Sequence, residues 1–293
     1  MTMNDAMKEE YGRCRILVEE KLDSLFSGGC AYGPLLEAMR YSLLAGGKRV
    51  RPIICLKFCE AAGGDMADAL DAACAVEILH TYSLIHDDLP CMDNDATRRG
   101  KPANHIKYGE LTATLAGDAL QASAFECLLS SNLPPAPVVE IGRLLAYAAG
   151  PHGICGGQYL DMLDNRDRPE ALYAVHGMKT AALISAAARI GVVAAGGTSG
   201  QLAAADEYSR EVGFAFQVRD DLLDLTASEE ELGKPVGSDR KGGKATFASL
   251  MSVGECEALI RKATDNAVAA LEGSFDDAAF LVWLAQALAA RKH

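Results

Sequence analysis

Residues 84–95, Leu-Ile-His-Asp-Asp-Leu-Pro-Cys-Met-Asp-Asn-Asp, decide the character of this chain. The run before them, residues 72–85, is almost entirely apolar or small, which is typical of a buried helix. A buried helix does not end in so many carboxylates unless something neutralises them. Because Pro90 disfavours helix at Leu89, we expect Asp87 and Asp88 on the last turn and Asp93 on the loop that follows.

These three aspartates suit Mg²⁺, which proteins hold through one or two carboxylates together with substrate phosphates and water. An acidic run on a solvated surface is the alternative, and it fits poorly with the apolar run that leads into Asp87. Arg98 and Arg99 come next. They could pair with Asp93 or Asp95, but arginine also suits bidentate recognition of phosphate. Acids and cations together predict a phosphorylated, metal-chelated ligand.

Composition limits the class of protein. The chain has 293 residues, 49% of them hydrophobic, and no composition break divides it, so we predict one domain over residues 1–293. The net charge of −12 argues against a nucleic-acid partner. Nine cysteines without a CxxC pair indicate reduced thiols. We expect a cytoplasmic protein without membrane insertion, because no signal peptide is visible and the most apolar window, residues 181–195, is short and contains Arg189.

Helical periodicity dominates, and no long apolar/polar alternation is present. We therefore predict an all-α, single-domain bundle of long helices. The expected helices cover residues 5–25, 32–45, 52–62, 66–89, 109–129, 137–149, 154–164, 169–195, 199–225, 255–271 and 276–291.

Residues 46–52, Gly-Gly-Lys-Arg-Val-Arg-Pro, form the first basic motif. The glycines let the backbone turn closely round a ligand, and Pro52 is expected to open a helix. Lys48 and Arg51 would then stand at a helix N-terminus, a natural anion site; a solvated basic loop is the alternative. His80 lies seven residues before Asp87 and shares its helix face, which favours ligand contact over a hydrogen-bonded core histidine.

Two further polar groups lie in the second half. Residues 156–161, Gly-Gly-Gln-Tyr-Leu-Asp, place a glutamine and an acid three positions apart, as an intrahelical pair or as functional groups. Lys179 and Thr180 interrupt a long apolar stretch. A buried lysine needs a partner, and an anionic ligand would supply one.

The second acidic cluster is in residues 216–224, Phe-Gln-Val-Arg-Asp-Asp-Leu-Leu-Asp. Asp220 and Asp224 are four residues apart and share a helix face, which Gln217 joins. Like charges at that spacing favour a bridging cation. Residues 227–246 then form a polar loop with Lys234, Lys241 and Lys244. We interpret it as a lid over phosphate, with a flexible surface loop as the alternative.

Taken together, these motifs resemble the trans-isoprenyl diphosphate synthases. The similarity runs in the family's order from about residue 40 to 250, through residues 46–52, 86–95, 98–102, 156–161, 179–180, 216–224 and 233–239. The insertion between Asp88 and Asp93 is similar to the bacterial and plastid branch, and the nearest type is the bacterial farnesyl diphosphate synthase. Ala96-Thr97 and Ala248 depart from residues common in relatives, which is expected to tune the metal loop and the end of the lid.

The resemblance implies an all-α fold with a central cavity, two acidic motifs facing each other across it, and a homodimer. It also implies three Mg²⁺ ions held by Asp87, Asp93 and Asp220, supported by Asp88, Asp221 and Asp224. The allylic diphosphate would be bound by Arg98, Lys179, Thr180, Gln217, Lys234 and Lys244. Isopentenyl diphosphate would be bound by Lys48, Arg51, His80 and Arg99. Catalytic roles fall to the three main aspartates, Asp88, Arg98, Lys179 and Lys234.

The implied reaction joins isopentenyl diphosphate to dimethylallyl and then geranyl diphosphate, giving farnesyl diphosphate after metal-assisted ionisation. The alternative product is geranylgeranyl diphosphate; a terpene cyclase and an inactive partner subunit fit less well, because both acidic motifs and the isopentenyl set are present. Chain length is expected to depend on Tyr82 or Ser83. Helix geometry places Ser83 nearer the Asp87 face, whereas the resemblance favours Tyr82, whose ring would act as a floor.

Overall fold

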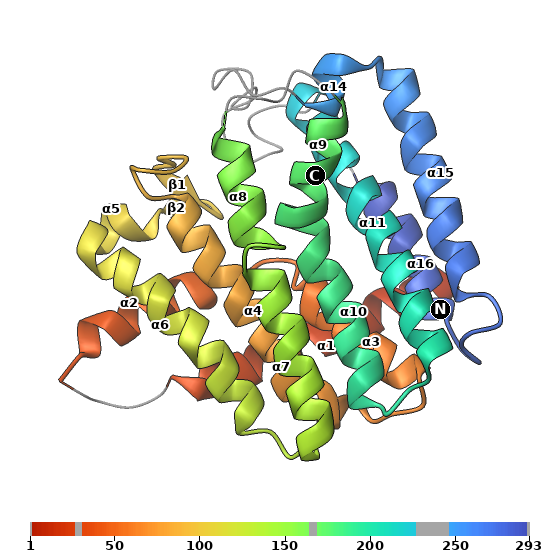
Figure 1. Ribbon diagram of the computed structural model, residues 1–293, viewed down its shortest axis with the longest axis horizontal. Coiled ribbons are helices and arrows are strands. Elements are labelled where there is room, and N and C mark those ends of the chain that lie inside the picture. Colours follow the sequence, from red (N-terminus) through yellow and green to blue (C-terminus); the bar gives the residue numbers. More distant parts are fainter. Residues whose placement is uncertain (1, 27–30, 164–168, 227–245, 292–293) are drawn as a thin grey trace. The chain divides into compact units, whose positions relative to one another are not determined.

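The computed structural model describes residues 2–26, 31–163, 169–226 and 246–291. The described chain is almost entirely helical, which confirms the predicted all-α class (Figure 1). It divides into two compact units, which are taken one at a time below. Unit 1 is Met1–Leu145 with Ile190–Gly197, and unit 2 is Ala146–Arg189 with Thr198–His293. The single domain over residues 1–293 stays a prediction.

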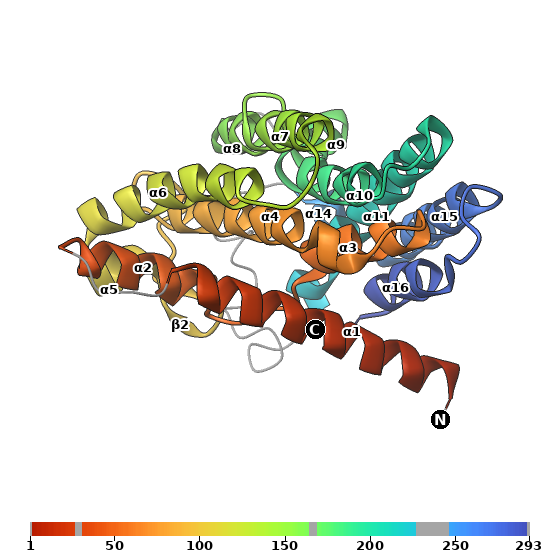
Figure 2. The same ribbon diagram turned by 90° about the horizontal axis from the view of Figure 1, so that it is seen from below.

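Unit 1 is built round α4, a helix buried on nearly all sides. Its buried apolar residues are small in the first half, up to Ala75, and larger after it, and they cover most of the helix surface, as expected of a helix in a core. The side chain of Asp65 accepts a hydrogen bond from Ala67 N at 2.8 Å and so caps its start. Figure 2 shows α6 lying along α4, and α1 lying along α3 and α4. The helices of this unit are α1 (Met3–Leu25), α2 (Gly33–Leu43), α3 (Val50–Ala61), α4 (Met66–Asp87), α5 (Asn104–Tyr108), α6 (Glu110–Leu129) and most of α7 (Pro135–Ala149).

Unit 2 is organised round α11, which packs most extensively against α15 (Figure 1). A buried cluster that includes Val218, Leu222, Phe247 and Ile260 fills the space between them. The helices of this unit are α8 (Ile154–Met162), α9 (Pro169–His176), the π-helical turn η1 (Gly177–Ala181), most of α10 (Ala182–Ala194), α11 (Ser199–Thr226), α14 (Phe247–Leu250), α15 (Val253–Leu271) and α16 (Ala279–Ala289).

Most predicted helices are found with boundaries shifted by a few residues. The predicted helix 66–89 ends earlier, at Asp87, so Asp88 is its C-cap residue and not part of the last turn. The predicted helix 169–195 is continuous in direction but contains the π turn η1. Helix α3 begins at Val50, before Pro52, because Arg49 takes the left-handed conformation at the N-cap. The short α5, α14 and the β1–β2 pair (Thr97–Arg98 with Lys101–Pro102) were not predicted, since each is too brief to show a period.

Two general expectations can be compared with this structure. The eight cysteines among the described residues are all free thiols, most of them buried. Leu172–Ala194 is long and apolar enough to cross a membrane by length and composition, but half of its most apolar window is buried inside the protein. Core helices of water-soluble proteins meet the same criterion, so this stretch is weak evidence for a membrane span.

Candidate functional site

The first acidic cluster lies where α4 ends. Asp87 is 8% exposed and Asp88 2% exposed. The chain then folds back over the helix end, because Asp93 N donates to the Asp87 carbonyl at 2.8 Å and Asn94 N to the Leu89 carbonyl at 3.2 Å. Asp93 therefore lies on the loop after the helix, as predicted, and its backbone is bonded to the helix end. The alternative of a solvated acidic surface does not fit Asp87 and Asp88.

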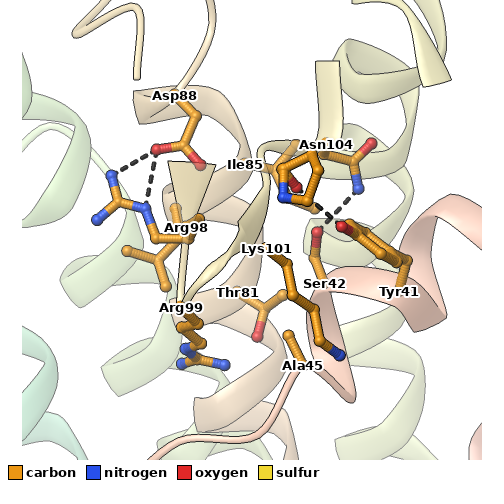
Figure 3. Close-up of a pocket in the computed structure, with 12 residues that line it drawn as sticks. Tyr41, Ser42, Ala45, Thr81, Ile85, Asp88, Arg98, Arg99, Lys101 and Asn104 are labelled. Carbon is orange, nitrogen blue, oxygen red and sulfur yellow. Dashed lines mark hydrogen bonds and ion pairs between the residues drawn. The ribbon is translucent and has the colours of Figure 1, made fainter. Parts of the chain in front are cut away.

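Arg98 holds the second aspartate of this cluster. Its guanidinium donates two hydrogen bonds to Asp88 Oδ1, one of them at 2.9 Å from Nε (Figure 3). It donates a third to Asp95 Oδ2 at 2.9 Å. Burial raises the pKa of Asp88, and the bond from Arg98 acts in the opposite direction. Arg98 therefore pairs with acids of its own motif in the substrate-free protein, while it remains 35% exposed at the side chain.

The β1–β2 pair that carries Arg98 is fixed to α2. Tyr41 Oη donates to the Pro102 carbonyl at 2.9 Å, and Asn104 Nδ2 donates to Ser42 Oγ and to the Ala38 carbonyl, both at 2.8 Å (Figure 3). The pocket beside these contacts has space for only about 20 Å³, room for roughly one water. It is too small for a prenyl chain, so its walls serve to position Arg98 and its neighbours.

The predicted basic set is partly brought together in unit 1. Arg51 Nη1 lies 3.4 Å from His80 Nε2, and Arg99 Nη1 donates to the Gly46 carbonyl at 2.6 Å. Burial, and then the charges of four arginines led by Arg51 and Arg99, hold the pKa of His80 well below its usual range. His80 is therefore a neutral hydrogen-bonding group. Lys48 is exposed, and its carbonyl accepts a hydrogen bond from Tyr11 Oη.

The second acidic cluster lies on α11. Gln217 Nε2 donates to Asp221 Oδ1 at 2.9 Å, and Thr180 Oγ1 donates to Gln217 Oε1 at 3.2 Å. Gln217 therefore binds Asp221, four residues on, and its predicted place on the face of Asp220 and Asp224 stays a prediction. Asp221 Oδ2 also accepts from Phe247 N at 2.8 Å. Asp221 thus anchors α14, and its role near a metal stays a prediction.

The other two acids of this cluster differ in exposure. Asp224 is 7% exposed. Asp220 is 42% exposed at its side chain and forms an ion pair at 2.5 Å with Arg291, whose guanidinium also lies over the ring of Phe216. Arg219 does not join the acids; it binds both carboxylate oxygens of Glu257, at 2.7 and 2.9 Å.

Lys179 and Thr180 stand on the π turn η1, a distortion often found at functional sites. The adjacent α8 can approach this turn because Gly157 has no side chain: a Cβ there would lie 2.4 Å from Lys179 N. That approach places Asp161 3.0 Å from Lys179 Nζ. Lys179 therefore has a partner within the protein, Asp161, where the sequence suggested an anionic ligand. Both amide atoms of Gln158 are buried, and neither has a hydrogen-bond partner among the residues that the structure describes.

Sequence reasoning missed four residues that shape these regions: Arg49, Glu77, Arg219 and Arg291. Glu77 did carry a signal, since it is the one acid in the apolar run 72–85. The three arginines carried none, because their partners are distant in sequence or are backbone carbonyls. The predicted Lys234 and Lys244 lie outside the described residues.

The carboxylates were tested for their fit to Mg²⁺. Among the described residues no group of three or more His, Cys, Asp or Glu side chains converges on one metal position. This excludes an all-protein cage within that part of the chain. It fits an ion held through one or two carboxylates and completed by substrate phosphates and water, as Mg²⁺ commonly is. Asp87 with Asp93, and Asp220 with Asp224, are the pairs that suit it.

Comparison with known proteins identifies the family. The family model for polyprenyl synthetase matches residues 33–278. A geranylgeranyl pyrophosphate synthase from Arabidopsis thaliana chloroplasts (number 3) is 49% identical over 265 residues, which cover 87% of this chain and 73% of that protein. The chain therefore belongs to the trans-isoprenyl diphosphate synthase family, a family of prenyltransferases.

Solved structures agree with the fold. An apo FPP/GFPP synthase from Zymomonas mobilis has a TM-score of 0.87 and 31% identity, covering 98% of this chain and 100% of its own. A geranylgeranyl pyrophosphate synthetase from Pyrococcus horikoshii has a TM-score of 0.88 and 32% identity, covering 97% and 99%. The predicted prenyltransferase class is confirmed. The predicted farnesyl product is not, since the relative with 49% identity is named for the longer product.

Proposed function

We propose that this chain condenses isopentenyl diphosphate with allylic diphosphates and makes geranylgeranyl diphosphate as its main product. The reaction class rests on two acidic clusters, one at the end of α4 and one on α11, each accompanied by cations. The family membership of the chain supports the same class. The name of the 49% identical relative favours the twenty-carbon product. Farnesyl diphosphate, which the size of the Tyr82 ring favours, is the second candidate product.

The chain's own groups divide the work of binding. Lys48, Arg51 and Arg99, with neutral His80, would hold the diphosphate of isopentenyl diphosphate. Arg98, Lys179 and Thr180 would hold the allylic diphosphate, which would take the place of the present acidic partners Asp88 and Asp161. Asp87, Asp93, Asp220 and Asp224 would hold Mg²⁺. When bound, Mg²⁺ supplies positive charge that stabilises the departing diphosphate.

The chemical step follows from charge. The carbon–oxygen bond of the allylic diphosphate breaks, and the electron pair leaves with the diphosphate while cations such as Lys179 stabilise it. The double bond of isopentenyl diphosphate then forms the new carbon–carbon bond with the allylic carbocation. A proton is lost to re-form a double bond, and the released diphosphate is the proposed base. Apolar surroundings of the kind that bury Leu222 and Leu223 keep water from capturing the cation.

Product length depends on how Tyr82 is placed. Its ring is 4% exposed and packs edge to face on His86, one turn further along α4, at 5.9 Å between ring centres. His86 in turn fits against Gly117 of α6, where a Cβ would lie 2.1 Å from its ring. Tyr82 thus shares the His86 face, and Ser83 is held by a bond from its hydroxyl to the His80 carbonyl. A ring packed on His86 in this way supports a growing prenyl chain that passes Tyr82 and reaches twenty carbons. The size of the ring supports the farnesyl candidate, in which Tyr82 stops the growing chain.

Chromatography of the dephosphorylated products would decide between the two. Purified protein with Mg²⁺, isopentenyl diphosphate and dimethylallyl diphosphate should yield the twenty-carbon alcohol, and Tyr82→Ala should leave that product unchanged. A fifteen-carbon product that lengthens in Tyr82→Ala would establish the farnesyl candidate instead. Absence of any condensation with dimethylallyl, geranyl or farnesyl primers would reject the proposed function as a whole.

The implied homodimer is also proposed. Leu111, Leu115 and Leu129 of α6 are 76%, 46% and 71% exposed, and Val139 of α7 is 63% exposed. Large apolar side chains exposed on neighbouring elements favour contact with another protein surface. Sedimentation of the purified chain would show whether two copies associate.

A further inference from the structure

A buried carboxylate, Glu77 of α4, connects two arginines that come from different motifs. Arg49 Nη1 donates to Glu77 Oε1 at 2.6 Å, and Arg99 Nη2 lies 3.6 Å from the same oxygen. The Glu77 and Arg49 side chains are 2% and 1% exposed, whereas Arg99 is 21% exposed. Two members of the group are therefore inaccessible to a ligand, and only Arg99 reaches toward solvent.

The same arginines fix the backbone of residues 43–49. Arg49 Nη2 donates to the Leu43 carbonyl at 2.7 Å, and Arg99 Nη1 donates to the Gly46 carbonyl at 2.6 Å. The Arg99 guanidinium also lies against Gly47, where a Cβ would be only 3.1 Å from Cζ. The segment between α2 and α3 is thus clamped at both ends by guanidinium groups that share Glu77.

This clamp maintains an unfavourable backbone. Arg49 and Arg99 both have positive φ, 52° and 53°, and Gly46 and Gly47 have φ of 85° and 132°. A residue with a side chain in the left-handed region costs on the order of 1 kcal/mol and persists only where its surroundings enforce it. The bonds to Glu77 and to the two carbonyls are the contacts that enforce it here.

The contacts of Arg49 and Glu77 also position the neighbouring cationic side chains. Lys48 and Arg51 flank Arg49 in sequence, so the conformation of Arg49 sets the direction in which both leave the loop. His80, one turn along α4 from Glu77, contacts Arg51 at 3.4 Å. Lys48 and Arg51 are thus one and two residues from Arg49, and His80 is one helical turn from Glu77. With Arg99, these are all the groups proposed to bind isopentenyl diphosphate.

We infer that Glu77 and Arg49 are positioning residues for the isopentenyl diphosphate subsite: without touching the ligand, they hold Arg99 and the loop of residues 46–51 in the conformation that binds its diphosphate. The inference rests on the proposed function, because it needs that substrate. It predicts an effect on one substrate and not on the other. A purely structural role would lower stability without that selectivity.

The test compares three variants of the full-length chain by steady-state kinetics, by calorimetric titration with isopentenyl diphosphate, and by denaturant unfolding. Glu77→Gln keeps the shape and removes the charge. It should raise the KM and Kd for isopentenyl diphosphate about tenfold or more, the amount that a charged hydrogen bond contributes, and change the allylic KM by less than about twofold. Glu77→Asp keeps the charge and should recover part of the affinity.

The decisive variant is the double substitution Arg49→Met with Glu77→Leu. Replacing both members of a buried ion pair by apolar residues often restores stability. We expect it to unfold near the wild-type denaturant midpoint and still bind isopentenyl diphosphate at least about tenfold more weakly, since Arg99 has lost its partner. Lys57→Met is the matched control: it removes another buried cation, paired with Glu10 and Glu60 on the same unit, and should lower stability without altering either KM.

Two outcomes would overturn the inference. One is a Glu77→Gln protein whose KM for isopentenyl diphosphate is unchanged, or changes no more than the allylic KM. The other is a double variant that regains both stability and affinity, because the pair would then be structural only. Failure of the proposed function looks different: the wild-type chain itself would neither bind isopentenyl diphosphate nor consume it.

Discussion

The end of α4 and the C-terminal part of α11 carry similar acidic clusters but neutralise them in different ways. At α4 the partner is local, since Arg98 binds Asp88 from ten residues away. At α11 the partners come from segments that are distant in sequence. Asp221 accepts a hydrogen bond from Phe247 N, 26 residues away. Asp220 pairs with Arg291, the last residue that the structure describes. The first cluster is a self-contained motif, and the second is assembled by the packing of the unit.

The comparison also separates two roles within each adjacent pair of aspartates. Asp88 and Asp221 are 2% and 4% exposed, and both have protein hydrogen-bond donors on their carboxylates. Their neighbours Asp87 and Asp220 are more exposed. We therefore propose that Asp88 and Asp221 mainly support the structure, and that Asp87 and Asp220 are the metal ligands. The predictions below test this division, starting with the largest effect.

Loss of the metal-binding member should have the same large effect in both regions. We expect Asp87→Ala and Asp220→Ala each to lower kcat at least about a thousandfold, because a missing ligand removes stabilisation of the departing diphosphate. Steady-state turnover at saturating Mg²⁺ is the measurement, with Glu126→Ala, an exposed acid on α6, as the control. Near-normal turnover in either aspartate variant would remove that cluster from the proposed metal site.

Loss of the structural member should distinguish the regions. Asp88→Ala and Asp221→Ala should each lower the free energy of unfolding by about 1–3 kcal/mol, because buried donors lose their acceptor. Hydrogen exchange should show where: Asp221→Ala should speed exchange in α14, at Phe247–Leu250, and Asp88→Ala at the β1–β2 pair. If both variants perturbed the same segment, the contrast between a local and an assembled cluster would fail.

The local cluster is the part that could be predicted from the sequence. The apolar run before Asp87 predicts a buried helix, and Pro90 predicts its end; the structure places that end only two residues earlier than expected. Arg98 stands close enough in sequence for its pairing with acids of the same motif to be considered beforehand. Short spacing allows such reasoning because few backbone conformations connect the two groups.

The assembled cluster could not be predicted in the same way. Periodicity placed Lys179 on a helix, but the π turn that carries it and the approach of α8 at Gly157 depend on packing between elements. The bond from Gln217 to Asp221 was not predicted, and the contacts beside it come from Thr180 on η1 and from Phe247 N on α14. Product length is harder still to predict from the sequence. Helix geometry favours Ser83 as the residue near the Asp87 face, whereas the family resemblance favours Tyr82.

The surroundings of His80 can be tested through the pH dependence of stability. His80 has a pKa well below 6.5 in the folded protein, so it stays neutral there while the unfolded chain takes up a proton as pH falls through 6.5. The unfolded state then binds more protons, and stability falls with decreasing pH by at most about 1.4 kcal/mol per unit. His80→Gln should remove this share of the slope between pH 6.5 and 5.5, measured by denaturant unfolding. An identical slope in both proteins would contradict a His80 whose pKa is lowered first by burial and then by the neighbouring arginines.

The smallest effect is expected where Arg291 covers Asp220. Arg291 lies 2.5 Å from the Asp220 carboxylate, so we expect it to compete with a metal ion for this predicted ligand. Because Asp220 is 42% exposed, the pair contributes less than about 1 kcal/mol, equivalent to at most roughly fivefold in affinity. Arg291→Gln should therefore bind Mn²⁺ about threefold more tightly, read by paramagnetic resonance without substrate, and Arg291→Lys should stay near the wild type. Weaker binding in Arg291→Gln would mean the opposite role: the guanidinium, stacked on Phe216 and bonded to its carbonyl at 2.9 Å, would then be orienting Asp220 for the metal and not shielding it.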